Sequence, residues 1–554
     1  MTSPDTKFAT TPSVAEGTGR VSHDTQPNDI EKPRAKVVET NAASVALAAA
    51  LAGRPPDVWS WSMMQLYGIM AVGYLVSTIN GFDGSLMGAI NAMKPYQETF
   101  GLDGAGSSTG IVFIIYNIGQ LVTLPLTPFL SDGYGRRVSI FVGCAVILIG
   151  TAVQATAHTL GQFIVGRMLL GFGAAVAQAT GPVYAVELAH PAYRGMMAGM
   201  YNNFWWLGNI VAGWCTYGSN LHYDNSWAWR IPTIIQAAMP AIVMILVFFF
   251  PESPRWLASK DRNEEALEVL AKYHGAGDRQ APIVQLQYRE ILEDRAENPS
   301  DDRWWDFREL FRDRQARYRT AMVIAMSFFG QWSGNNVVSY FMVRAYPAMV
   351  LNAGITNTNT QLLLNAINPI LSMIAAIAGT TVLDRLGRRL MMIGSLAGSL
   401  FFYCLLTAFT AEAQKNDNLS YGVIVSIYLY GICFAAGMTP CQTLYPSECL
   451  ENRTRAKGSS VKFLFINIAM IVNTFGISVG IREIQWKLYL VYIIWIAIEI
   501  VVIFFFFPET AGKTLEELTH IFQAKSPRKE SVKKTKVQVD DVGRIVEIDK
   551  PASA

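Results

Sequence analysis

Asp83 and Arg167 are two ionisable residues that lie inside long apolar runs of the sequence. A lone charge at the centre of a bilayer costs roughly 3 kcal/mol or more, so such residues usually pair or face a cavity and mark a path for ions or protons. Arg167 favours ionised Asp83 and burial favours the neutral acid, so a proton arriving at Asp83 would release Arg167. We therefore expect a proton-coupling pair. The alternative is a permanent ion pair that only locks two helices together.

Neutral amides recur in the same apolar runs, and an amide offers a hydroxyl-rich solute both a donor and an acceptor without the desolvation cost of a charge. Gln331 and Asn336 lie near enough in helical angle to share a cavity, with Tyr340 one turn beyond Asn336. The other such amides are Asn202 and Asn203, Asn365 and Asn368, and Asn467 and Asn473. They predict a polar central cavity. Hydrogen bonds between helices would use the same side chains, and for each asparagine except Asn336 both interpretations stay open.

Membrane-spanning helices must position these residues. The chain has 554 residues, of which 51% are apolar and 16% charged, and its mean hydropathy is +0.25. A helix needs about 20 mostly apolar residues to cross the hydrocarbon, and twelve runs meet that need. They begin near Leu66, Gly110, Val138, Gly161, Met196, Ile231, Thr320, Leu362, Leu390, Tyr421, Ser459 and Leu488. The sequence therefore predicts an all-α membrane protein with twelve transmembrane helices in a lipid bilayer.

Several function classes are excluded by composition and motifs. A formal net charge of +2 without a basic stripe argues against nucleic acid as a partner. The six cysteines are dispersed without CxxC spacing, which argues against a disulfide framework and a zinc site. The chain has neither a GxxxxGK[ST] phosphate loop nor an HExxH motif, so we expect no cofactor, no metal and no enzymatic activity.

Polar segments divide the chain into five parts. We expect a disordered N-terminal tail (1–60), a six-helix half (61–250), a linker with short surface helices (251–319), a second six-helix half (320–522) and a disordered C-terminal tail (523–554). If the spans alternate, the clusters of Lys and Arg in short loops all fall on one side of the membrane. By the positive-inside rule this side is cytoplasmic, and it holds both termini and the linker.

Charged motifs repeat between the two halves at nearly one spacing. Asp132-Gly-Tyr-Gly-Arg-Arg137 matches Asp384-Arg-Leu-Gly-Arg-Arg389, and Pro251-Glu-Ser matches Pro508-Glu-Thr. Glu187 and Arg194 likewise match Glu448 and Arg455. This repetition predicts two pseudo-symmetric six-helix halves with a solute site between them at the midplane. That architecture is typical of transporters that work by alternating access.

These loop motifs, with Gly166-Arg167-Met-Leu-Leu-Gly171-Phe-Gly173 and Pro182-Val-Tyr-Ala-Val-Glu187, resemble the sugar porter family of the major facilitator superfamily over residues 64–522. Gly81-Phe-Asp-Gly-Ser-Leu-Met87 and Gln331-Trp-Ser-Gly-Asn-Asn-Val-Val-Ser-Tyr340 are similar to its fungal lactose permease and cellodextrin transporter branch. The resemblance implies the major facilitator fold and a coupling role for Asp83 and Arg167. It also implies a gating network that latches the halves when the cavity opens outward, formed by Asp132, Arg136, Glu187, Arg194, Asp384, Arg388, Glu448 and Arg455.

The resemblance also implies substrate-binding positions. Gln331 and Asn336 match the second glutamine and the asparagine of the signature in the seventh span. Four positions where monosaccharide porters carry larger side chains hold smaller ones here, namely Asn202, Ser372, Thr443 and Asn467. The site should therefore be roomier than a hexose pocket. The predicted substrate-binding residues are Asn202, Gln331, Asn336, Tyr340, Asn368, Ser372, Thr443 and Asn467.

The function predicted from the sequence is proton-coupled import of a disaccharide or related glycoside across the plasma membrane by a monomer. One alternative keeps the fold and changes the cargo to a secondary metabolite, a polyol or another glycoside, with export as a possible direction. A second alternative is a sugar sensor that signals without transport. Lys462 could touch an anionic solute, but its long side chain lies near one end of its span, and we expect it to reach the membrane interface instead.

Overall fold

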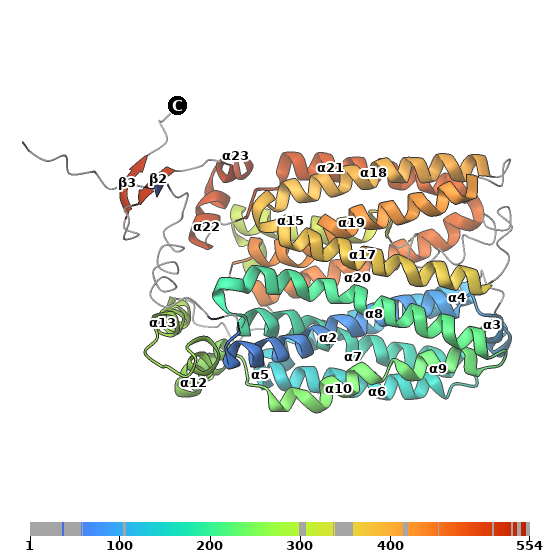
Figure 1. Cartoon of the computed structure of the whole chain (residues 1–554), viewed down its shortest axis with the longest axis horizontal. Helices are drawn as coiled ribbons and strands as arrows, with labels where there is room; N and C mark the ends of the chain where they lie inside the picture. The colour runs from blue at the N-terminus through green and yellow to red at the C-terminus, as the bar shows by residue number, and fades with distance from the viewer. Residues whose placement is uncertain are drawn as a thin grey trace, which may run out of the picture. The chain divides into compact units, whose positions relative to one another are not determined.

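The computed structural model describes residues 36–37, 57, 59–102, 107–297, 306–335, 337, 358–413, 419–451, 454–511, 513, 515–532, 536–539 and 545–549. The chain forms two compact units, Asn41–Lys534 and a smaller one of Met1–Thr40 with Thr535–Ala554. The larger unit is helical (Figure 1).

The first half of the larger unit contains long helices joined by shorter ones. Its elements are α2 (Trp61–Ile90), α3 (Lys94–Phe100), α4 (Ser107–Thr123), α5 (Leu126–Tyr134), α6 (Arg136–Ala155), α7 (Leu160–Leu188), α8 (Arg194–His222), α9 (Trp227–Ile235) and α10 (Ala238–Leu246), with one-turn 3₁₀ helices at Pro191–Tyr193 and Val247–Phe249. Helices α4 and α5 meet at an angle of 51° at Leu124 and Pro125. Proline explains the bend because it removes a backbone donor from the helix.

The second half follows the same pattern. Its elements are α15 (Arg314–Trp332), α17 (Thr358–Leu386), α18 (Arg388–Ala413), α19 (Ser420–Cys449), α20 (Arg455–Ile484), a 3₁₀ turn at Gln485–Lys487 and α21 (Leu488–Phe506), followed by α22 (Leu515–Gln523) and α23 (Pro527–Ser531). In Figure 1 the helices of the first half, blue to green, and those of the second half, yellow to red, form two adjacent groups. Helix α8 of the first group packs against α17 of the second.

Among the described residues, nine helices are long and apolar enough to span a membrane, or ten when α4 and α5 count as one bent span. Helices α8 and α15 occupy the remaining two places in the predicted order of twelve. They are more polar, since α8 carries Asn202, Asn203 and Asn209 and α15 begins with several arginines. The structure therefore has the predicted all-α fold of twelve transmembrane helices in two six-helix halves, and the long helices begin within a few residues of the predicted starts.

Glycines allow helices α2 and α8 to cross in direct backbone contact. A Cβ atom added at Gly81 would lie 1.9 Å from the backbone oxygen of Trp205, and one added at Gly208 would lie 2.0 Å from that of Thr78. Small residues at such crossings are typical of membrane helices, where close packing replaces the hydrophobic effect as the source of association. The crossing lies two residues from Asp83, so it helps to position that carboxyl group.

Four short helices lie in the linker between the halves, namely α11 (Pro254–Ser259), α12 (Asn263–His274), α13 (Pro282–Glu297) and α14 (Glu309–Arg312). Helix α12 docks on the first half. Tyr273 joins the buried apolar cluster of α2, α6 and α7, and His274 Nε2 lies 3.1 Å from the backbone oxygen of Leu188. Helix α14 docks on the second half instead, because Leu310 joins its buried apolar cluster and Thr320 Oγ1 donates to the backbone oxygen of Leu310 over 2.9 Å. The two ends of the linker are thus attached to different halves.

The smaller unit contains a three-stranded antiparallel sheet in the order β1-β2-β3. Its strands are β1 (Lys36–Val37), β2 (Lys536–Val539) and β3 (Ile545–Asp549). Lys36 pairs with Val539, and Val537 pairs with Ile548. These short strands lie within the two tails that the sequence predicts to be disordered. The apolar and polar residues of Lys-Val-Gln-Val alternate with the period of a strand, which is a local signal that the overall polarity of the tails obscured.

Candidate functional site

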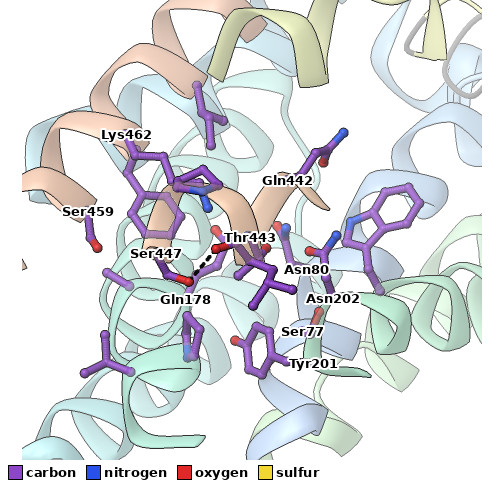
Figure 2. Close-up of a pocket in the computed structure, with 18 of the residues that line it drawn as sticks. Ser77, Asn80, Gln178, Tyr201, Asn202, Gln442, Thr443, Ser447, Ser459 and Lys462 are labelled. Atoms are coloured by element: carbon purple, nitrogen blue, oxygen red, sulfur yellow. Dashed lines mark hydrogen bonds between the residues drawn. The ribbon is translucent and has the colours of Figure 1, made fainter. Parts of the chain in front are cut away.

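A cavity of about 610 Å³ lies between the two halves, and this volume is in the range of small-molecule sites. The first half contributes polar residues from α2, α4, α7 and α8, and the second half contributes residues from α15, α19 and α20. Figure 2 shows side chains from both halves pointing toward the same space. Its polar lining includes Ser77, Asn80, Asp83, Tyr116, Asn117, Gln120, Gln178, Tyr201, Asn202, Gln331, Asn335, Thr439, Gln442, Thr443, Ser447, Ser459 and Lys462.

The cavity extends from mid-helix to the end of the helices that carries the arginine-rich loops. Its lining reaches Arg136 and Glu187 in the first half and Glu448 in the second. At the opposite end the halves are in contact, because Asn220 Nδ2 of α8 donates to Asn359 Oδ1 of α17 over 2.7 Å. The structure thus represents a state in which the cavity faces the side that the loop charges predict to be cytoplasmic.

Asp83 and Arg167 form a buried ion pair between α2 and α7. Each residue is only 2% exposed, and Asp83 also lines the cavity. Gln236 Nε2 of the sixth span donates to the same carboxylate oxygen, Asp83 Oδ1, over 2.9 Å. The Arg167 guanidinium carbon lies 4.9 Å from the centre of the Tyr116 ring, a cation–π distance. Tyr116 in turn donates to Asn80 Oδ1 over 3.0 Å, which extends the network along the cavity wall.

The structure brings three of the predicted substrate-binding residues to the cavity. Asn202, Gln331 and Thr443 all line it. Asn202 Nδ2 also donates to the backbone oxygen of Thr439 over 2.5 Å, so this amide connects the two halves as well. Asn336 and Tyr340 lie outside the described residues.

Three other predicted substrate-binding residues lie outside the cavity lining in this state. Asn467 is 2% exposed, and its amide donates to the backbone oxygen of Phe463 one turn earlier in the same helix. Asn368 and Ser372 of α17 are buried against Gly431 of α19. Their interhelical surroundings correspond to the alternative interpretation of buried amides, in which polar groups join helices instead of binding solute.

Four amide side chains in the first half were missed as cavity residues. Asn80, Asn117, Gln120 and Gln178 all line the cavity, and Gln120 Nε2 donates to Gln178 Oε1 over 3.4 Å. They are amides in apolar spans, which is the same signal that selected asparagines elsewhere in the chain. The indole rings of Trp205 and Trp206 lie beside them, in an edge-to-face pair with centroids 4.9 Å apart.

Glu499 is a second buried acid that sequence reasoning missed. This α21 residue is 0% exposed, and Ser333 Oγ donates to its Oε2 over 2.7 Å. The backbone oxygen of Ser333 accepts a hydrogen bond from Tyr430 over 2.7 Å, and Gly334 follows with a φ of +93°. Glu499 thus stabilises the C-terminal end of α15, directly after the cavity residue Gln331. A glutamate in an otherwise apolar last span was the signal that could have identified it.

The gating charges pair within each half in this state. Arg136 contacts Asp132 over 2.8 Å and Glu187 over 3.2 Å. In the second half Arg388 contacts Glu448 over 3.0 Å. The side chains of Arg194, Asp384 and Arg455 lie outside the described residues. Both described pairs sit at the open end of the cavity, where a contact between halves would close it.

A repeated carboxylate caps the helix that follows each arginine-rich loop. Glu252 accepts hydrogen bonds from the backbone amides of Arg136 (3.1 Å) and Arg137 (3.2 Å). Glu509 accepts the equivalent bonds from Arg388 (2.8 Å) and Arg389 (3.0 Å). A negative charge is favourable at a helix N-terminus because the first amides have no partner within the helix. This explains physically why Pro-Glu-Ser and Pro-Glu-Thr repeat in the two halves.

We expect Glu252→Ala to lower the unfolding free energy by about 1–3 kcal/mol, because three backbone donors, those of Arg136, Arg137 and Ser253, lose their acceptor. Burial raises the pKa of the Glu252 carboxyl, although the backbone donors oppose the shift. Glu252→Gln, which keeps one acceptor oxygen and no charge, should therefore cost less than Glu252→Ala. Thermal melting of the purified protein measures both. Glu264→Ala, at a linker carboxylate that is 85% exposed, serves as the control; a loss equal to that of Glu252→Ala would contradict the capping role.

Known proteins share this sequence pattern and this fold. A family model described as "Sugar (and other) transporter" matches residues 69–522. The chain is 30% identical over 485 residues to the high-affinity glucose transporter of Kluyveromyces lactis, covering 82% of this chain and 85% of that one. It is 27% identical over 503 residues to the quinate permease of Neurospora terricola, covering 85% and 90%.

Solved structures show the same fold. The proton:xylose symporter XylE bound to 6-bromo-6-deoxy-D-glucose has a TM-score of 0.69 at 20% identity, covering 84% of this chain and 100% of that one. The inward open conformation of XylE from E. coli has a TM-score of 0.64 at 21% identity, covering 82% and 99%. At such identities the likeness establishes the arrangement of the helices and leaves the solute to be argued from the cavity.

Proposed function

Because the chain belongs to the sugar (and other) transporter family, we propose that it imports a disaccharide or related glycoside together with a proton, by alternating access across the plasma membrane. One observation supports the proton coupling above all others. A carboxyl group that is 2% exposed borders the solute cavity and is paired with a buried arginine from another helix. A change in the protonation of this group would alter the contact between two helices and the charge at the cavity wall together.

The coupling step follows from the contacts of Asp83. Ionised Asp83 holds α2 and α7 together through Arg167 and is bound by Gln236 of the sixth span. A proton that arrives on Asp83 cancels the attraction between the carboxyl and the guanidinium. Arg167 then keeps only neutral neighbours such as the Tyr116 ring. Helices α2 and α7 are expected to pack differently in the inward-facing and outward-facing states. Loss of the ion pair changes the relative stability of these two states, and in this way a proton biases the transport cycle.

Neutral hydrogen-bonding groups and the volume of the cavity support a glycoside as cargo. Amides from both halves surround the space, and Asn202 and Thr443 leave room where monosaccharide porters carry larger side chains. The rings of Trp205 and Trp206 offer apolar surfaces against which the faces of a sugar can pack. A solute that reaches both walls would draw the halves together, as alternating access requires.

The charge pairs at the open end of the cavity supply the second element of the cycle. In this state Arg136 and Glu187 pair within the first half, and Arg388 and Glu448 pair within the second. We infer that the outward-facing state brings these groups together across the halves. Partly desolvated pairs that form in only one state can shift the equilibrium between states by a few kcal/mol.

Uptake measurements in a strain without other sugar transporters test the proposed function. We expect a labelled disaccharide or glycoside to accumulate against its gradient while the external medium becomes more alkaline. Each pH unit supplies about 1.4 kcal/mol and each 100 mV about 2.3 kcal/mol for the uptake of one proton. Failure to accumulate any sugar, sugar acid or glycoside in a panel would contradict transport. Accumulation without proton movement would contradict coupling.

A further inference from the structure

Lys462 lies within the solute cavity, where the proposed proton-coupled transport of a neutral sugar gives it no role. Residues Ser459, Lys462, Phe463, Ile466 and Met470 of α20 all line the cavity. Their spacing of three and four places them on one face of the helix, so this face of α20 forms part of the cavity wall. The sequence predicted that Lys462 reaches the membrane interface. That prediction was wrong, because the lysine lines the cavity instead. Figure 2 shows its side chain entering the space between the two walls.

The carboxylates of the cavity are already paired with arginines. Asp83 pairs with Arg167, Glu187 with Arg136, and Glu448 with Arg388. Among the described residues, by contrast, Lys462 forms no ion pair with any carboxylate. The contact that the structure gives its ammonium group is the Phe463 ring, whose centre lies 5.7 Å from Nζ. The paired charges cancel locally, and Lys462 adds a positive charge within the helix bundle. The lining also includes Arg255 and Lys513, which lie in the segments beyond the ends of the spans.

The groups around Lys462 fit a solute that carries both hydroxyls and a negative charge. Thr443, Ser447 and Ser459 of the same half as the lysine provide hydroxyl groups to the cavity, and Gln178 provides an amide from the opposite half (Figure 2). A cation in a partly desolvated cavity attracts an anion far more strongly than it would in water, and the low-dielectric walls concentrate its field. A neutral sugar would leave the partly buried ammonium without a counter-ion, whereas a carboxylate would neutralise it.

We propose that the transported solute is a sugar acid, meaning a sugar or glycoside with one carboxylate, and that Lys462 binds this carboxylate. This inference rests on the proposed function and specifies its substrate class. The hydroxyl and amide groups of the cavity bind the sugar rings, and Lys462 distinguishes the acid from its neutral counterpart. Lys462 is thus a specificity-determining residue, separate from the proton site at Asp83.

The test compares a neutral sugar with its own acid. Wild-type cells are given labelled lactose or lactobionate, which differ in that one ring is opened and oxidised to a carboxylate. We expect lactobionate uptake to be about tenfold or more higher than lactose uptake at equal concentration, because a charged hydrogen bond in a partly buried site is worth at least one factor of ten. Lys462→Gln should remove that preference, and Lys462→Arg should retain much of it.

Lys457→Gln is the matched control. Lys457 lies on the same helix, but its ammonium group pairs with Glu309 over 3.6 Å and it does not line the cavity. This variant should keep the preference for the acid. Thermal melting of the purified proteins provides a readout that does not depend on transport. A melting transition of Lys462→Gln shows that the variant is folded, and lactobionate should raise the melting temperature of the wild type but not that of the variant.

Two results would overturn the inference while the proposed function stands. One is accumulation of lactose with no preference for lactobionate in the wild type. The other is an equal loss of both solutes in folded Lys462→Gln, which would make Lys462 a part of the gate and not of solute recognition. Failure of the proposed function looks different, because the wild type would then accumulate no compound of the panel and move no protons.

Discussion

Asp83→Asn is expected to abolish uphill uptake while leaving downhill exchange of the solute. Asparagine keeps the size of the side chain and a hydrogen-bond acceptor for Gln236, but it cannot bind or release a proton. A wild-type carrier that moves one proton with each solute gains about tenfold in accumulation for each pH unit across the membrane. The variant should gain nothing from the pH gradient, so its internal solute concentration should level off at the external one. Labelled uptake with simultaneous pH recording measures both quantities.

The exchange measurement separates loss of coupling from loss of folding. Arg167 remains buried in Asp83→Asn without its counter-ion, and removing one partner of a buried ion pair commonly destabilises a protein by about 3–5 kcal/mol. Persistent exchange shows that the variant is folded and inserted. Asp224→Asn, in the exposed segment between α8 and α9, should behave as wild type. Undiminished accumulation by Asp83→Asn would remove this carboxyl from the mechanism.

Gly81→Ala is expected to lower the stability of the folded protein. The new Cβ would lie 1.9 Å from the backbone oxygen of Trp205, so α2 and α8 must separate where they cross. Overpacking costs about 1–3 kcal/mol when side chains can adjust, and a backbone atom adjusts less readily. We expect a lower melting temperature and reduced transport, because Asp83 lies two residues away.

Gly73→Ala on the same helix is the matched control. Gly73 is buried, but nothing lies within 4 Å of the position that its Cβ would occupy. Alanine favours a helix over glycine by up to about 1 kcal/mol, so this variant should melt at the same temperature as wild type or slightly higher. Equal melting temperatures for Gly81→Ala and Gly73→Ala would show that the close crossing does not limit stability.

The fold followed from local properties of the chain. Each span needs about 20 apolar residues in succession, and this count predicted where α2, α6 and α21 begin to within a few residues. The repeated motifs showed that the chain has two related halves. They also indicated the sugar porter family, which the match over residues 69–522 confirms. Helices α8 and α15 have weaker apolar signals, yet both were among the twelve predicted runs, which begin near Met196 and Thr320.

The cavity was predicted less completely. Gln331 and Asn202 line it, but Asn467 and Ser372 do not in this state, and Asn80 was missed. All of them are polar residues in apolar helices, so composition cannot separate those that bind solute from those that join helices. The difference lies in which side of each helix faces the other half.

The sequence by itself thus determined the number of spans, their order, the two-half repeat and the family, because these depend on runs and motifs along one chain. Only the tertiary structure decided which side chains meet. It brought Gln236 of the sixth span to Asp83, buried Glu499 against Ser333 and turned Lys462 into the cavity. The physical reason is that hydropathy sets the depth of a residue in the membrane, whereas its partners depend on how each helix is rotated. That rotation is fixed by close packing against several neighbouring helices that are distant in sequence.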